Sequence, residues 1–199
     1  MLMNHTLNDD VDRLKTTQQV QPEELDLKEI FDIACELVAE DYSKAQDGMS
    51  LVVRKATMDD AKKAGRWKKT KGKDGYGLLP WEKAVSKTRY KKSNFTLAVC
   101  DKAGNLFALV SGKVDLVTDK VILNLIERDG SMEAFEGRAI PFVSRLMYQL
   151  AEMFECSEVR IMEPAEGLIE RYKEFFDDAD EVYSHRPPYI KAPVYTLTD

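Results

Sequence analysis

The stretch Ala134-Phe135-Glu136-Gly137-Arg138-Ala139 separates a run of predicted strands from a long predicted helix, and this junction decides the fold. Before it, apolar segments at Phe95–Cys100, Leu106–Val114 and Val121–Arg128 are joined by short polar turns, which predicts antiparallel hairpins. After it, apolar residues recur at helical spacing as far as about Phe154. Three hairpin strands followed by a helix indicate an α+β fold.

Shorter elements extend the pattern on both sides of this junction. Val159–Met162 is apolar and lies between two predicted helices, which is typical of a buried parallel strand. Upstream, the sequence predicts a strand at Leu51–Arg54 and a helix that Thr57 caps. Downstream, it predicts a helix over about residues 165–176 and strands at Glu181–Ser184 and Pro193–Leu197.

Composition excludes several classes of protein. The chain has 199 residues with 44% hydrophobic and 32% charged side chains, which is typical of a soluble globular protein. Its net charge of −6 argues against indiscriminate binding to nucleic acid or membranes, and no apolar run is long enough to span a bilayer. Three distant cysteines and two histidines argue against a disulfide framework and a metal site, so we expect a cytoplasmic protein.

The first 47 residues form an acidic extension to a second region at 48–199. Twelve acidic residues against four Lys or Arg give residues 1–47 a net charge of −8. A polar tail is followed by an amphipathic helix that runs to about Asp41. Its apolar face needs a surface to cover, either on its own domain or on a second subunit of a homodimer.

Residues 62–92 form a basic segment, with twelve Lys or Arg against two acids and a net charge of +10. One interpretation is a surface for an anionic partner, RNA or an acidic protein. The other is a solvated loop, or one that pairs with the acidic extension. The residues that would contact an anion are Lys68, Lys69, Lys71, Lys73, Trp67 and Trp81.

Three segments resemble motifs of the GNAT superfamily of acyl-coenzyme A N-acyltransferases. Leu51–Ala61 is similar to the superfamily's opening strand and turn, Ala134–Ala139 to its Arg/Gln-x-x-Gly-x-Gly/Ala loop, and Glu163–Phe176 to its segment with a conserved tyrosine. The resemblance covers about residues 49–199. It implies a mixed, mostly antiparallel central sheet flanked by helices, with acetyl-coenzyme A as cosubstrate and an amine as acceptor.

The resemblance assigns a cofactor role to Glu136, Gly137, Arg138 and Ala139. Small residues at a helix N-terminus let backbone N–H groups approach a pyrophosphate. The alternative is that Gly137 only ends a loop. The thioester would then lie where two strands diverge, near Glu127 and Val159.

Two residues are the candidate catalytic groups. Tyr172 matches the tyrosine that protonates the departing thiolate, and the alternative is a core tyrosine. Glu127 is the candidate base, on a face that the alternation of strand residues shares with Leu123 and Leu125; the alternative is a solvated carboxylate. His185 is the fallback base. The function implied is an N-acetyltransferase that needs no metal and acts by direct attack, and the alternative is an inactive GNAT-like binding module.

Overall fold

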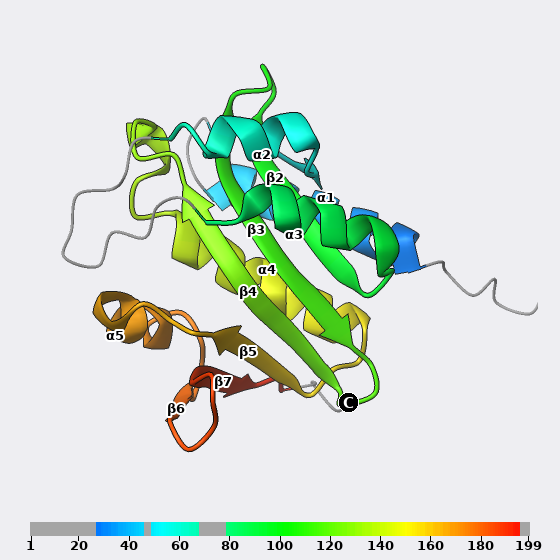
Figure 1. Ribbon diagram of the computed structural model, residues 1–199, viewed down its shortest axis with the longest axis vertical. Helices are drawn as coiled ribbons and strands as arrows, with labels where there is room; N and C mark the ends of the chain where they lie inside the picture. Colours follow the sequence, from blue (N-terminus) through cyan, green and yellow to red (C-terminus); the bar gives the residue numbers. More distant parts are fainter. Residues whose placement is uncertain (1–26, 46–48, 68–78, 196–199) are drawn as a thin grey trace, which may run out of the picture.

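The computed structural model describes residues 27–45, 49–67 and 79–195 (Figure 1). Its elements follow the predicted order of strands and helices. They are α1 (Leu27–Ala45), β1 (Leu51–Lys55), α2 (Met58–Ala64), α3 (Trp81–Tyr90), β2 (Asn94–Asp101), β3 (Leu106–Asp115), β4 (Lys120–Arg128), η1 (Glu133–Phe135), α4 (Ala139–Met153), β5 (Glu158–Met162), η2 (Glu166–Leu168), α5 (Ile169–Lys173), β6 (Asp180–Val182) and β7 (Tyr189–Pro193).

The strands form one seven-stranded sheet in the order β1-β2-β3-β4-β5-β7-β6. Neighbouring strands are antiparallel except for β4 and β5, which are parallel. This arrangement confirms the predicted α+β class, the hairpins and the parallel strand after α4.

Helices cover both faces of the sheet. The larger core cluster lies between the sheet and the helices α1 and α4, whereas α2 and α3 pack on the other face over a smaller cluster (Figure 1). Two helical layers around a sheet bury both faces of the central strands, which explains why nearly every residue of β2 and β3 is buried.

Helix α1 packs on its own domain. It contacts α4 and β1, and it buries Ala34, Cys35 and Val38 in the larger core. The hydroxyl of Tyr42 donates a long hydrogen bond of 3.5 Å to the carbonyl oxygen of Arg138, just before α4. The helix of the acidic extension therefore belongs to the same core as the sheet.

The opening strand and turn are held by a buried carboxylate. Asp60 accepts two hydrogen bonds from the guanidinium of Arg54, at 2.6 and 2.9 Å, and one from the backbone N–H of Thr57 at 2.8 Å. Thr57 in turn accepts from the N–H of Asp60, which completes a capping box at the start of α2. The residues shared with the superfamily's opening pattern thus fix the β1–α2 turn.

Two predictions near the C-terminus were wrong. The last strand is Tyr189–Pro193 rather than Pro193–Leu197, because it starts directly after the Pro187-Pro188 turn and pairs with β5 from there. The helix expected over about residues 165–176 is a short 3-10 turn, η2, followed by the single short helix α5.

Candidate active site

Strand β4 contains a bulge that separates its two halves. Ser111 of β3 pairs with Leu125, but the next residue, Gly112, pairs with Leu123, so Asn124 is an extra residue in β4. A bulge bends a strand and raises its twist. It also moves the following residues to the opposite face of the sheet.

The bulge coincides with the point where β4 and β5 part. Their parallel pairing runs from Lys120 with Glu158 to Leu123 with Ile161 and goes no further. Beyond Leu123 the edge of β4 that faces β5 has no strand partner among the described residues (Figure 1). Val159 lies inside the paired part, so the expected divergence near Val159 was wrong by two residues.

The loop between β4 and α4 presents free backbone amides. Gly137 has a φ of 71°, a conformation that favours glycine, and a Cβ added there would meet nothing within 4 Å. Arg138 makes no side-chain hydrogen bond as the N-cap of α4. Within the described part of the chain, the N–H groups of Gly137, Ala139 and Ile140 have no acceptor, as expected for an uncapped helix start.

The side chains of this loop hold it in place. Phe135 is fully buried and stacks on Phe107 with ring centroids 5.6 Å apart. Glu136 is exposed, and its carboxylate pairs with Arg128 at 3.3 Å. The guanidinium of Arg138 contacts the sulfur of Met49 at 3.7 Å, so this side chain extends toward the segment that precedes β1.

Glu127 lies on the face of the sheet that carries α2 and α3. The indole Nε1–H of Trp81 donates to its carboxylate oxygen Oε2 at 2.5 Å. Leu123 belongs to the larger core and Leu125 to the smaller one, so the two leucines lie on opposite faces. The expectation that Glu127 shares a face with both was wrong, because the bulge at Asn124 reverses the alternation.

The predicted anion-contacting residues have different surroundings. Trp81 is only 2% exposed and its Nε1–H is bound to Glu127, so it does not offer a free ring face for stacking, contrary to the expectation. Trp67 is half-buried and lines a surface pocket. The four predicted lysines, Lys68, Lys69, Lys71 and Lys73, lie outside the described residues.

Tyr172 is buried in the larger core. It is 3% exposed, and its ring packs against Phe176. Burial raises the pKa of its phenol well above the usual range, so the hydroxyl stays protonated at neutral pH. His185, the fallback base, is exposed on the loop between β6 and β7.

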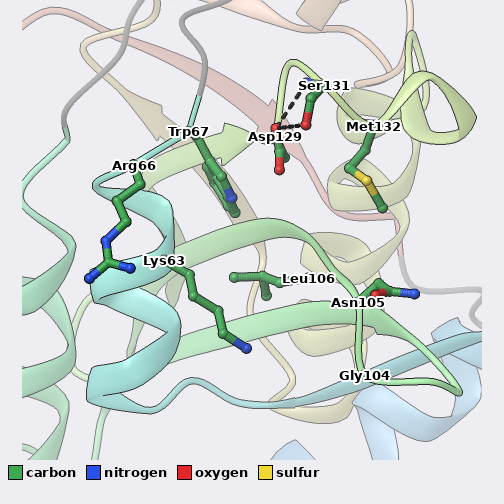
Figure 2. A pocket seen from close by; sticks show the side chains of 9 residues that line it. All are labelled: Lys63, Arg66, Trp67, Gly104, Asn105, Leu106, Asp129, Ser131 and Met132. Carbon is green, nitrogen blue, oxygen red and sulfur yellow. Dashed lines mark hydrogen bonds between the residues drawn. The ribbon is translucent and has the colours of Figure 1, made fainter.

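A pocket of about 510 Å³ lies at the end of β4 (Figure 2). The sequence alone did not single it out, because its walls come from three separate segments. Its lining residues are Lys63, Arg66 and Trp67 at the end of α2, Gly104, Asn105 and Leu106 at the start of β3, and Asp129, Ser131 and Met132 after β4.

Other chemistries find less support among the described residues. No group of three or more His, Cys, Asp or Glu side chains there is arranged to hold a metal ion. Burial raises the pKa of Cys35 to about 12 and that of Cys156 to about 11, so neither supplies a thiolate nucleophile at neutral pH. In the same part of the chain, no helix has both the length and the apolar character to cross a bilayer.

Solved acetyltransferases share this fold. Spermidine N-acetyltransferase from Vibrio cholerae, in complex with CoA and spermine, aligns over 72% of this chain and 95% of its own, with 12% identity and a TM-score of 0.52. A point mutant of that enzyme aligns over 72% and 93%, with 10% identity and a TM-score of 0.51. No family profile matches the sequence, and no curated protein does. The chain therefore has an acyltransferase fold, and in particular that of the GNAT superfamily.

Proposed function

We propose that the chain is an acetyl-coenzyme A-dependent N-acetyltransferase in which the acceptor amine attacks the thioester directly. The observation that carries the proposal is the continuity of one segment: the bulge at Asn124, the unpaired edge of β4 and the free amides at the start of α4 follow one another along the chain. One cosubstrate can span all three features.

Each feature suits a part of coenzyme A. The N–H groups of Gly137, Ala139 and Ile140 would bind the pyrophosphate, because a helix N-terminus attracts negative charge. The unpaired edge of β4 offers backbone donors and acceptors to the amides of the pantetheine arm. Arg128 neutralises Glu136 in part, which reduces the repulsion that this carboxylate exerts on a phosphate.

The chain's own residues would handle the protons. Acetyl-coenzyme A supplies an acetyl thioester, whose C–S bond breaks as the C–N bond to the acceptor forms. Glu127 would accept the proton that the attacking amine loses, with its carboxylate oriented by Trp81. Tyr172 would hold its O–H toward the departing sulfur; because its pKa is raised, it serves as a hydrogen-bond donor rather than as a strong acid.

Direct attack also agrees with the state of the thiols. All three cysteines are buried, and burial raises the pKa of each. A route through an acetylated cysteine would need an accessible thiolate.

One observation favours a second candidate, a GNAT-like binding module without catalysis. Glu136 places an exposed carboxylate directly before Gly137, and Ala134 stands where the resemblance would have Arg or Gln. Both substitutions weaken a phosphate site. In this alternative the fold is kept for its surfaces.

Calorimetric titration with acetyl-coenzyme A separates the two candidates. The enzyme should bind it and release free thiol when amines are added. Gly137→Glu should abolish binding, because it places a charge among the free amides. Gly104→Glu is the matched control: Gly104 also has a positive φ, of 85°, and open space around an added Cβ, so it suffers the same backbone strain elsewhere. Absence of binding to the unmodified chain at millimolar acetyl-coenzyme A would reject the enzyme.

A further inference from the structure

The pocket at the end of β4 lies on the same face of the sheet as the candidate base. Asp129, which lines it, comes two residues after Glu127, and residues two apart in a strand point to the same face about 7 Å apart. The N–H of Asp129 still bonds to the carbonyl oxygen of Phe107, so the strand geometry continues to this residue. A molecule in the pocket therefore lies beside Glu127.

One wall of the pocket is cationic and uncompensated. Lys63 and Arg66 come from the end of α2, and both are exposed. Neither side chain has an ion-pair or hydrogen-bond partner in the described part of the chain. Figure 2 shows Lys63 extending from α2 toward Leu106, with Arg66 at the outer edge.

The acidic residue of the pocket does not neutralise these cations. Oδ1 of Asp129 accepts hydrogen bonds from the backbone N–H of Ser131 at 2.9 Å and from its hydroxyl at 2.7 Å. These bonds hold the carboxylate in its own turn, on the β4 side of the pocket. Positive charge and negative charge thus lie on different walls.

The remaining lining is largely apolar. Trp67 and Met132 reach into the pocket from opposite sides, above the buried Leu106 (Figure 2). A pocket with an apolar lining and a few polar anchors is typical of a small-molecule site. Its about 510 Å³ accommodates a compound of modest size.

We propose that this pocket selects an acceptor that carries both an amine and an anionic group, a carboxylate or a phosphate. The proposal rests on the proposed function. Lys63 and Arg66 bind the anion, Trp67 and Met132 contact the carbon skeleton, and the amine lies toward Glu127. A polyamine, which carries only positive charge, is repelled by the α2 wall.

Three probes of one chain length isolate the anionic group: 6-aminohexanoate, hexylamine and 1,6-diaminohexane. Calorimetric titration of the full chain, with and without coenzyme A, should show 6-aminohexanoate binding about tenfold more tightly than the other two. The double variant Lys63→Glu, Arg66→Glu should lose this preference. Lys62→Glu, an exposed neighbour on α2 outside the pocket, should keep it.

A further pair of probes identifies the anion. Tighter binding of 2-aminoethyl phosphate than of 6-aminohexanoate indicates a phosphate-bearing acceptor, and the reverse order indicates a carboxylate. Preference for 1,6-diaminohexane, a preference that survives the double variant, or no binding of any probe at millimolar concentration would each overturn the proposal. Failure of coenzyme A to bind while the anion preference persists would reject the acetyltransferase and leave the anion pocket standing.

Discussion

The indole of Trp81 and the carboxylate of Glu127 are joined by a hydrogen bond of 2.5 Å across 46 positions of sequence. Trp81 is the first residue of α3, and Glu127 is the second-to-last residue of β4. The bond fixes the helix to the strand beyond the bulge. It also fixes the direction in which the candidate base presents its second oxygen.

Replacing Trp81 with Phe should change the pH dependence of acetyl transfer. The variant loses the N–H that stabilises the charged carboxylate, so the acidic limb of the pH–rate profile should move to higher pH. Unfolding by urea should show a stability loss of about 2–3 kcal/mol, because the smaller ring also leaves a cavity. A purely structural role for Trp81 would lower stability and leave the profile in place.

Glu127→Gln is the comparison variant for this bond. Its amide oxygen still accepts from the indole, so stability should stay within about 1 kcal/mol of the unmodified chain. Turnover should fall by about 10²-fold or more, because an amide cannot take up the proton. Unchanged turnover would remove Glu127 from the reaction.

Tyr172→Phe keeps the ring that packs on Phe176 and removes only the hydroxyl. Stability should change by less than about 1 kcal/mol, since no described group bonds to this hydroxyl. Turnover should fall while the affinity for acetyl-coenzyme A is retained. Single-turnover kinetics together with calorimetry would check this, and equal turnover in both proteins would make Tyr172 a core residue only.

Gly112→Ala should be strongly destabilising because of its place opposite the bulge. An added Cβ would lie 2.3 Å from the carbonyl oxygen of Ile122 and 2.4 Å from Cζ of Phe95. Relief requires backbone movement, so we expect a loss of about 2–4 kcal/mol in urea unfolding. Gly104→Ala meets no atom within 4 Å and should cost only the strain of its positive φ. Similar losses in the two variants would contradict this account.

The buried Asp60 should make stability depend on acid pH. Burial alone would raise its pKa, but the hydrogen bonds from Arg54 and Thr57 outweigh burial and lower the pKa to about 2. The stabilisation is therefore complete above the ordinary pKa of about 3.9 and is lost as the pH falls through about 2, an effect on the order of 2 kcal/mol.

Urea midpoints at several pH values would test this dependence. Asp60→Asn should be less stable than the unmodified chain at neutral pH, and the difference should shrink toward pH 2. The exposed neighbour Asp59 provides the control, because Asp59→Asn should leave the curve unchanged. A constant difference between Asp60→Asn and the unmodified chain at all pH values would show that the carboxylate's charge does not stabilise the fold.

Local patterns were enough to predict the hairpins of β2, β3 and β4, because their apolar runs and turn residues need no knowledge of neighbours. The face of Glu127 was different. A bulge is a property of two paired strands, and nothing in Leu123-Asn124-Leu125 alone shows that β3 skips Asn124.

The same limit applies to the candidate site. The Gly137 loop could be found from its spacing, whereas Trp81 looked like a surface aromatic because it follows a lysine-rich segment. Its burial depends on β4, 46 positions away, which supplies its hydrogen-bond acceptor. The pocket brings together three distant segments, so only the folded chain reveals the separation of its charges.

The packing of α1 on α4 has a consequence for synthesis of the chain. Helix α1 leaves the ribosome early, but α4 follows only roughly 100 residues later, which takes about 5–20 s at ordinary rates of translation. During that interval Ala34, Cys35 and Val38 lack the partner that buries them. The nascent chain therefore exposes an apolar helix face long enough for a chaperone to bind it, and slowing translation between residues 45 and 139 should increase aggregation.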